Sequence, residues 1–290
     1  MSKHILVTGA NGQLGSEFQT LTKNSEDNYT FVDRSILDLG SISAITSYFE
    51  THSFDVIINC AAYTAVDKAE SDKSTAYAIN HEAVEALAQI SKAKNISLIQ
   101  ISTDYVFDGK NFMPYVEDDL TNPQSVYGAS KLSGEMAMNA VNPENSIIIR
   151  TSWVYSSFGN NFVKTMLRLG KERDTLGVIF DQVGTPTYAK DLAQAILKII
   201  PQLHNKKVRT YHYSNEGVTS WYDFSKAIFE LSNIECKVNA IETVAYPTPA
   251  TRPHYALLNK AKIKDAYALE VPYWKDSLQT CLITLKEVHV

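Results

Sequence analysis

The sequence predicts an α/β fold with an open, doubly wound parallel sheet and a smaller, partly interleaved second part. Short apolar runs alternate with amphipathic segments of helical length through the first 150 residues. The run at 55–60 has almost no polar alternation, as expected of a parallel strand covered on both faces. A glycine-rich turn directly follows the first run. Repeated β-α-β units of this kind favour a parallel sheet with helices on both sides.

The elements of the first half follow in order. Strands are predicted at 5–7, 29–33, 55–60, 98–102 and 147–149. Helices are predicted where apolar residues recur at helical spacing, at 14–21, 42–49, 83–90 and 127–139. Ser41 is well placed to cap the second of these helices, whose expected apolar face includes Ile42. This half therefore reads as a regular sheet with its connecting helices.

After about residue 150 the pattern is looser. Helices are predicted around 162–169 and 192–199. The stretch 246–253 holds three prolines in eight residues, so it cannot be the interior of a helix. Irregular segments of this kind commonly supply binding loops. The change near residue 150 is one of pattern, with no linker, and the two parts are expected to interleave.

Composition and charge exclude several classes of protein. The 290 residues are 44% hydrophobic, which argues against disorder, and the 27 basic and 32 acidic residues leave a net charge of −5. A nucleic-acid binder usually has a strongly basic face, so no nucleic-acid partner is expected. No apolar run approaches the roughly 20 residues of a membrane helix, so no membrane partner is expected either. Three widely spaced cysteines without a Cys-x-x-Cys motif indicate reduced thiols and a cytoplasmic location.

The first motif is a phosphate-binding turn. Gly9, Gly12 and Gly15 follow the first strand at G-x-x-G-x-x-G spacing and open a helix. Glycines let the backbone approach a pyrophosphate, and the helix N-terminus favours that anion. Asp33 ends the second strand, where a carboxylate binds the adenosine ribose, and Arg34 beside it suits the 2′-phosphate of NADP. The order of these features predicts a Rossmann-type domain that uses NADPH or NADH, and both cofactors remain open.

The second motif is a proton donor. Tyr127 and Lys131 lie four residues apart on one face of a predicted helix. A nearby ammonium is expected to lower the pKa of the phenol and prepare it for proton exchange with a substrate oxygen. A hydroxyl at the end of the preceding strand is available to share that oxygen. The same spacing recurs at Tyr222 and Lys226 in the irregular half, where we interpret it as an ordinary amphipathic helix.

With these residues in view, the chain resembles the extended short-chain dehydrogenases/reductases, and among them the dTDP-4-dehydrorhamnose reductase family. The resemblance spans residues 9–253. It rests on the stretches 61–70, 102–107, 127–131, 150–155, 159–162 and 245–253. It implies reduction of dTDP-4-dehydro-L-rhamnose to dTDP-L-rhamnose with hydride from NADPH or NADH, in the synthesis of nucleotide sugars for polysaccharides.

The resemblance also implies roles for individual residues. The catalytic group would be Thr103, Tyr127 and Lys131. The residues expected at the cofactor, which include two of this group, are Gly9, Gly12, Gln13, Leu14, Gly15, Asp33, Arg34, Asp38, Leu39, Ala61, Ala62, Tyr63, Tyr127 and Lys131. The residues expected at the sugar nucleotide are Thr103, Asp104, Tyr127, Trp153 and Arg252. Two of these have plainer alternatives: Trp153 as a core residue and Arg252 as a solvated loop charge.

The resulting domain prediction assigns 1–150 to an NAD(P)-binding Rossmann domain that also receives segments from about 178–215, and 151–290 to a substrate-binding part. Some reductases of this type are expected to use magnesium at a subunit contact, through acidic residues that include one just before the position of Asp191. Here that residue is Lys190, so no metal is expected. A homodimer remains among the expected partners, and the sequence leaves the oligomeric state open.

Two other functions remain open at this stage. One is a sugar-nucleotide dehydratase or epimerase of the same superfamily. A dehydratase needs a second acid after the Thr-Asp pair, and this chain has Tyr105 there, which favours the reductase. The other is a regulatory subunit that binds cofactor without catalysis, against which the Thr103, Tyr127 and Lys131 group is complete. The residues leave undecided the nucleotide of the substrate, the preferred cofactor and the glycan that uses the product.

Overall fold

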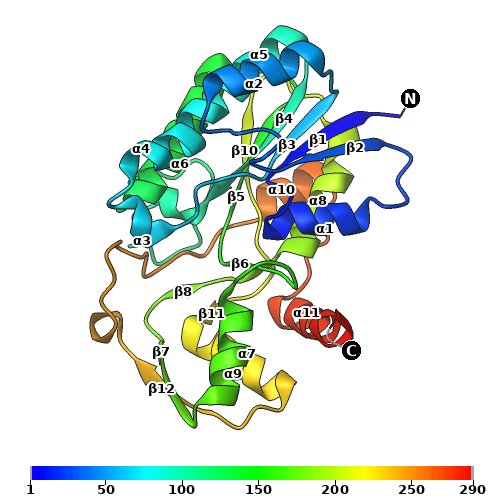
Figure 1. The fold of residues 1–290 in the computed structure, drawn as a ribbon. Helices are drawn as coiled ribbons and strands as arrows, with labels where there is room; N and C mark the ends of the chain where they lie inside the picture. The colour runs from blue at the N-terminus through cyan, green and yellow to red at the C-terminus, as the bar shows by residue number, and fades with distance from the viewer. Residues whose placement is uncertain (1, 289–290) are drawn as a thin grey trace.

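A computed structural model describes residues 2–288 of the chain and shows a large lobe above a smaller one (Figure 1). The large lobe holds a six-stranded sheet in the order β10-β5-β4-β3-β1-β2, and every neighbouring pair of strands is parallel. Helices cover both faces of this sheet. The predicted α/β fold with a doubly wound parallel sheet is therefore confirmed.

The strands of the large sheet are β1 (His4–Thr8), β2 (Asn28–Val32), β3 (Val56–Asn59), β4 (Ser97–Thr103), β5 (Ile147–Thr151) and β10 (Arg209–His212). Three two-stranded pairings use β6 (Val154–Tyr155), β7 (Thr175–Ile179), β8 (Val183–Gly184), β9 (Thr187–Tyr188), β11 (Thr219–Ser220) and β12 (Lys237–Ile241). All five predicted strands are present. β10 and the short strands were not predicted.

The longer helices are α1 (Gln13–Leu21), α2 (Ile42–Thr51), α5 (Ala83–Lys94), α6 (Val126–Val141), α7 (Phe162–Glu172), α8 (Ala189–Ile199), α9 (Trp221–Ser232) and α11 (Trp274–Val288). The shorter helices are α3 (Val66–Ala69), α4 (Lys73–Tyr77) and α10 (Ala261–Tyr267). A π-helical turn lies at Ala78–Glu82, and the 3₁₀ turns are Asp104–Val106, Ile200–Gln202 and Thr243–Ala245.

The predicted helices are all found. Ser41 caps α2, as expected, by accepting a hydrogen bond from the amide of Ala44 at 3.3 Å. Ile42 is 44% exposed and does not share the buried face of α2 that the sequence assigned to it. Tyr222 and Lys226 lie on α9, an ordinary amphipathic helix, and the proline-rich stretch 246–253 is a loop.

Alternate residues of each strand face opposite layers. Ile5 and Val7 of β1 pack with α1, α8 and α10, whereas Leu6 between them packs with α2 and α5. Because side chains alternate along a strand, both faces of the central strands must be apolar to be covered in this way. This explains the near-continuous apolar run at β3, all of whose residues are buried.

The sheet changes direction at β1. In the sheet, β2 pairs with one edge of β1 and β3 pairs with the other, so the order of the strands reverses at β1. The carboxyl ends of β1 and β3 therefore border a crevice. Ligands of open α/β sheets bind at such a point. A buried polar chain crosses this end: Thr8 Oγ1 donates to Asn59 Oδ1 at 2.6 Å, and Asn59 Nδ2 donates to Gln100 Oε1 at 2.7 Å.

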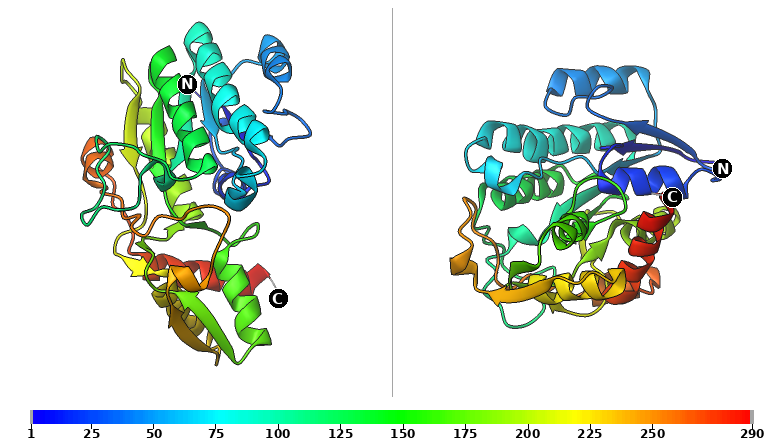
Figure 2. Two further views of the ribbon diagram at one scale, coloured as in Figure 1. Left: turned by 90° about the vertical axis from the view of Figure 1, so that its left-hand side faces the viewer. Right: turned by 60° about the horizontal axis from the view of Figure 1, so that its bottom comes forward.

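Later segments of the chain return to the large lobe. The sequence predicted that segments from about 178–215 would join this lobe. Two elements of that range do so: α8 packs against β1 and β5, and β10 pairs with β5. The helix α10 joins them, which the sequence did not indicate. The smaller lobe holds α7, α9, α11, β7 and β12 (Figure 1 and Figure 2). Buried side chains of these elements, together with Tyr155 and Tyr188, form a separate apolar cluster. The exact division into 1–150 and 151–290 stays a prediction.

No helix in the described range, 2–288, is long and apolar enough to cross a membrane.

Candidate functional site

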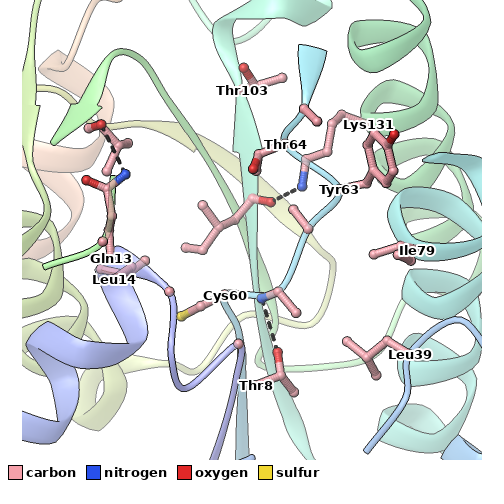
Figure 3. Close-up of a pocket in the computed structure, with 18 of the residues that line it drawn as sticks. Thr8, Gln13, Leu14, Leu39, Cys60, Tyr63, Thr64, Ile79, Thr103 and Lys131 are labelled. Carbon is pink, nitrogen blue, oxygen red and sulfur yellow. Dashed lines mark hydrogen bonds between the residues drawn. The ribbon is translucent and has the colours of Figure 1, made fainter. Parts of the chain in front are cut away.

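A cavity of about 1070 Å³ opens at the carboxyl ends of the strands, where the strand order reverses between β1 and β3 (Figure 3). Its walls come from the turns after β1, β2, β3 and β4, from α6 and from the segment after β5. Of the residues predicted at the site, two do not line it: Gly15 and Arg252. All the others do, which brings together segments separated by more than 100 residues in the sequence.

The glycine turn shapes one end of the cavity. Gly9 has a φ of +67°, and a Cβ there would lie 2.8 Å from the amide nitrogen of Ala61. Gly12 precedes α1 and supplies no side-chain cap, so the first N–H groups of this helix face outward without an intrahelical acceptor. Such a helix start favours an anion.

Gly15 lies behind this turn. A Cβ on Gly15 would come 2.3 Å from the carbonyl oxygen of Gly9. Gly15 therefore permits close packing of α1 against the turn, and the structure places it away from the cavity wall. Its predicted contact with the cofactor is replaced by this packing role, which the third glycine of such turns usually has.

The ribose end of the cavity is defined by the turn after β2. Asp33 accepts hydrogen bonds from Asn11 Nδ2 at 2.6 Å and from the amide and hydroxyl of Ser35 at 2.9 and 2.6 Å. These bonds, those from Ser35 above all, lower the pKa of the Asp33 carboxyl. Arg34 is 79% exposed and lies 3.5 Å from Asp38. An acceptor and a cation are thus both available here.

The segment after β3 is held by a residue that sequence reasoning missed. Asn80 is buried in the π-helical turn, accepts from the amide of Tyr63 at 2.9 Å and donates to its carbonyl at 3.1 Å. It also donates to the hydroxyl of Ser130, three residues after Tyr127. Asn80 therefore ties the wall formed by 61–63 to the helix that carries the catalytic pair. Nothing in the spacing around Asn80 signals this contact.

The predicted proton donor lies deep in the cavity. Tyr127 is buried on α6 next to Thr103, and the ring of Tyr105 meets the ring of Tyr127 edge-on at 5.5 Å. Thr103 Oγ1 donates to Asp104 Oδ1 at 2.9 Å. Asp104 Oδ2 is buried and has no hydrogen-bond partner among the described residues. Burial raises the pKa of the Asp104 carboxyl to about 7.

The pKa of Tyr127 corrects a prediction. The sequence indicates that Lys131 lowers it, but burial raises it to about 12, with the adjacent Thr103 hydroxyl opposing this rise and the nearby Asp104 adding to it. The ammonium of Lys131 instead donates to the carbonyl of Ile101 at 2.6 Å. Tyr127 is consequently a neutral phenol near pH 7, which is the form that can donate a proton.

Lys131 is itself perturbed by its surroundings. Burial lowers the pKa of the Lys131 ammonium to about 8, while the carboxylate of Glu135 counteracts this shift. Cys60 also faces this group, and burial raises the pKa of the Cys60 thiol. Lys131 therefore holds a positive charge at neutral pH, on the side of the cavity across from Gln13 and Leu14 (Figure 3).

Glu135 belongs to a buried cluster that the sequence analysis did not identify. Its carboxylate pairs with Arg150 at 2.7 Å and accepts from the hydroxyl of Ser102 at 2.5 Å. Arg150 also stacks over the ring of Phe107. Glu135 lies one helical turn beyond Lys131, and this i, i+4 spacing was the available signal. The cluster anchors α6 to the ends of β4 and β5 beneath the catalytic residues.

A second cavity, of about 640 Å³, adjoins the first. Tyr105, Trp153 and Trp221 line both cavities. The indoles of Trp153 and Trp221 stack with their ring centres 3.6 Å apart and 12° between their planes. Trp153, with a φ of +49°, thus lines the site instead of lying in the core. The sequence analysis did not identify Trp221.

Arg252 lines the second cavity and is not a solvated loop charge. Its guanidinium makes two hydrogen bonds to Asp67, at 2.6 and 3.0 Å. Asp67 also accepts from the amide of Ala250 at 3.2 Å. This pair joins the proline-rich loop to the start of α3 at the mouth of the site.

Residues 2–288 contain no cluster of three His, Cys, Asp or Glu side chains that could hold a metal ion. Asp191, beside Lys190, accepts from Ser277 Oγ at 2.5 Å and from Asn215 Nδ2 at 2.7 Å. Its carboxylate is therefore engaged within the protein.

The sheet topology, glycine turn and Tyr127–Lys131 pair define a Rossmann-type protein of the extended short-chain dehydrogenase/reductase class. Residues 3–287 match the family model described as the RmlD substrate binding domain. The chain belongs to this family.

Named relatives agree with this assignment. The chain is 42% identical over 286 residues to a dTDP-4-dehydrorhamnose reductase of Aggregatibacter actinomycetemcomitans, covering 95% of this chain and 97% of that protein. A crystal structure of a dTDP-4-dehydrorhamnose reductase from Clostridium acetobutylicum matches at 43% identity with a TM-score of 0.93, over 98% of this chain and 99% of the other. One from Bacillus anthracis, in complex with NADP, matches at 38% identity and a TM-score of 0.93, over 98% and 100%.

Proposed function

We propose that this protein reduces dTDP-4-dehydro-L-rhamnose to dTDP-L-rhamnose with hydride from NADPH or NADH. The observation that carries the proposal is the position of Thr103, Tyr127 and Lys131 in the cavity that also contains the glycine turn. A proton donor and a dinucleotide-phosphate cradle therefore face one space. Membership of a family whose named relatives are dTDP-4-dehydrorhamnose reductases supports the choice of substrate.

The residues present fit a nicotinamide dinucleotide. A Cβ at Gly9 would collide with the backbone after β3, so the open turn depends on glycine. Gly12, Gln13 and Leu14 at the start of α1 would hold the pyrophosphate, and Asp33 with Arg34 would bind the adenosine ribose or its 2′-phosphate. The segments that would flank the two ends of the cofactor are Asp38–Leu39 and Ala61–Tyr63. When bound, this cofactor supplies the hydride.

The protein supplies the proton and the electrostatics. The raised pKa keeps Tyr127 protonated, so its phenol can protonate the oxygen of the substrate C4 carbonyl as negative charge develops there. The ammonium of Lys131 lies one helical turn from Tyr127 on α6 and donates to the carbonyl of Ile101. With the cofactor bound, it would stabilise the phenolate left on Tyr127 and bind the nicotinamide ribose. Thr103 and Asp104 form a polar wall beside the reacting oxygen.

The second cavity suits the nucleoside diphosphate of the substrate. It contains the aromatic rings of Trp153 and Trp221 and three arginines, Arg168, Arg173 and Arg252. Guanidinium groups bind diphosphates, and aromatic rings stack on bases and sugars. The continuity of the two cavities at Tyr105 and the tryptophan pair would let one substrate reach from the arginines to Tyr127.

The test follows NADPH and NADH absorbance after addition of freshly prepared dTDP-4-dehydro-L-rhamnose. Stoichiometric loss of reduced cofactor, with formation of dTDP-L-rhamnose, is the expected result. An epimerase or dehydratase would change the sugar without net consumption of cofactor. Cofactor binding without reduction of any deoxy-keto sugar nucleotide would instead indicate a regulatory subunit.

We extend the proposal to the setting of the reaction. A cytoplasmic location is supported by Cys60, Cys236 and Cys281, which are free thiols in the structure. The oligomeric state, for which the sequence left a homodimer open, is to be measured by sedimentation with and without magnesium. A magnesium-dependent change of assembly would contradict the prediction made from Lys190.

A further inference from the structure

The segment 159–162 carries a sequence match that the proposed function leaves without a role. Gly159 and Asn160 line the large cavity. From Phe162 onward, α7 lines the second cavity, with Thr165, Met166 and Leu169. Asn161 therefore lies in the sequence between the residues that line the large cavity and those that line the second cavity.

Asn161 makes contacts in both directions. Its Oδ1 accepts from the amide of Lys164 at 3.1 Å and thereby caps α7. Its Nδ2 donates to Gln13 Oε1 at 3.0 Å. Gln13 is the first residue of α1 and lies at the phosphate turn, 148 positions away in the sequence. One side chain thus connects the N-terminus of α1 to the N-terminus of α7.

The donor group of Asn161 is shared among more acceptors than it has protons. Besides Gln13, Nδ2 lies 2.7 Å from the carbonyl of Ser156 and 3.3 Å from that of Phe158. An amide NH₂ has two protons, so three oxygens compete for them. Any change that makes Gln13 Oε1 a better acceptor shifts this competition toward the bond to Gln13.

An anion at the phosphate turn would make such a change. Gln13 Nε2 has only a long contact, 3.4 Å to the carbonyl of Val154, and is free to donate to a phosphate oxygen. Hydrogen bonds in a chain polarise one another, so donation from Nε2 strengthens acceptance at Oε1. The bond to Asn161, and with it the cap of α7, is then favoured.

We propose that Asn161 is a positioning residue that couples the two cavities, so that a dinucleotide at Gln13 strengthens binding of the sugar nucleotide beside α7. The inference rests on the proposed function, because that function assigns one ligand to each cavity. α7 transmits the effect through Phe162, whose ring packs on Trp221 at 4.5 Å, and Trp221 stacks on Trp153. By thermodynamic reciprocity the sugar nucleotide must strengthen dinucleotide binding by the same factor.

The experiment measures the Kd of dTDP by calorimetry without and with saturating NADP⁺. The wild-type protein is expected to bind dTDP about fivefold more tightly, or better, when NADP⁺ is present, within the usual range of coupling between sites. Asn161→Ser keeps a good helix cap, but its hydroxyl is too short to reach Gln13. In this variant the ratio of the two Kd values should fall to about one.

Two further variants separate coupling from folding. Asn161→Asp also caps a helix and lacks the N–H that Gln13 accepts, so it should lose the coupling as well. Ser41→Ala removes the cap of α2, and the Ser41 side chain bonds to Ser43 and Ala44, with no bond to Gln13 or Asn161. Because Gly40 beside it lines the large cavity, this variant can change both Kd values, but it should keep their wild-type ratio. A helix cap as such is then not the cause of any loss.

The outcomes distinguish this inference from the function beneath it. Independent binding of the two ligands to the wild type, or an unchanged ratio in Asn161→Ser and Asn161→Asp, would overturn the coupling alone. Failure of the wild type to bind NADP⁺ or dTDP would overturn the coupling together with the proposed function.

Discussion

Asp104 should destabilise the fold at alkaline pH, and Asp104→Asn should relieve that cost. The carboxyl is 3% exposed, and burial raises its pKa from an ordinary value of 3.8 to about 7. At a pH between 3.8 and about 7, Asp104 is therefore protonated in the folded protein and ionised in the unfolded chain. The contribution of Asp104 to the free energy of unfolding is therefore fully present below about pH 4 and is lost as the pH rises through about 7. The rise corresponds to about 4 kcal/mol.

Asparagine keeps the shape of this side chain and does not titrate. Its Oδ1 can still accept from the hydroxyl of Thr103, as Asp104 does at 2.9 Å. Urea unfolding of both proteins at several pH values gives the free energy of unfolding by linear extrapolation. The advantage of Asp104→Asn over wild type should grow by about 3 kcal/mol between about pH 5 and about pH 8.5. Other titrating groups contribute to both proteins and cancel in the difference.

Asp108→Asn provides a matched control with the opposite sign. A hydrogen bond from Tyr115, first among several, lowers the pKa of the Asp108 carboxyl. Its stabilising effect is present at neutral pH and lost in acid, so this variant should be less stable than wild type at neutral pH. A difference between Asp104→Asn and wild type that does not vary with pH would refute the account of Asp104.

Three further predictions concern the cofactor and the proton. Tyr127→Phe should lower kcat by roughly a hundredfold to ten-thousandfold, the usual value of a general acid, while the Kd of NADPH changes less than about tenfold; near-normal turnover would contradict the role of Tyr127. Arg34→Ala should reduce kcat/KM for NADPH by about tenfold or more and leave that for NADH unchanged, and equal losses with both cofactors would count against a 2′-phosphate contact. Gly15→Ala places a Cβ 2.3 Å from a backbone oxygen and should lower Tm and cofactor affinity, whereas Gly177→Ala, whose Cβ would lie 3.3 Å from the Ile241 side chain, should change both much less.

The sequence predicted those parts of the fold and site that depend on local pattern. The apolar run of Ile5, Leu6 and Val7 predicts a strand by itself, and the glycine spacing after it predicts the turn. The spacing of Tyr127 and Lys131 places both on one helix face, and the structure brings them to the cavity.

The remaining features depend on tertiary contacts. The side chain of Asn80 reaches Ser130 because α6 packs closely on the π-helical turn. A Cβ on Gly134 would lie 2.1 Å from the carbonyl oxygen of Asn80, and no short motif encodes that approach. The pKa of Tyr127 depends on how deeply its phenol is buried, whereas the ammonium of Lys131, which the sequence predicted would lower this pKa, donates to the carbonyl of Ile101. Trp221 reaches Trp153 only because α9 packs in the smaller lobe and starts beside the segment after β5.

The return of the chain to form β10 limits how the protein can be divided. β10 pairs with β5 from Ile147 to Arg150, and all five residues of β5 are buried. A fragment ending at residue 150 would carry the nucleotide-binding turn but would leave β5 as an open, apolar edge. Open edges of this kind promote aggregation by pairing with other chains. The halves of this protein are therefore poor modules for fusion or exchange, and intact chains are the better starting point for altering its specificity.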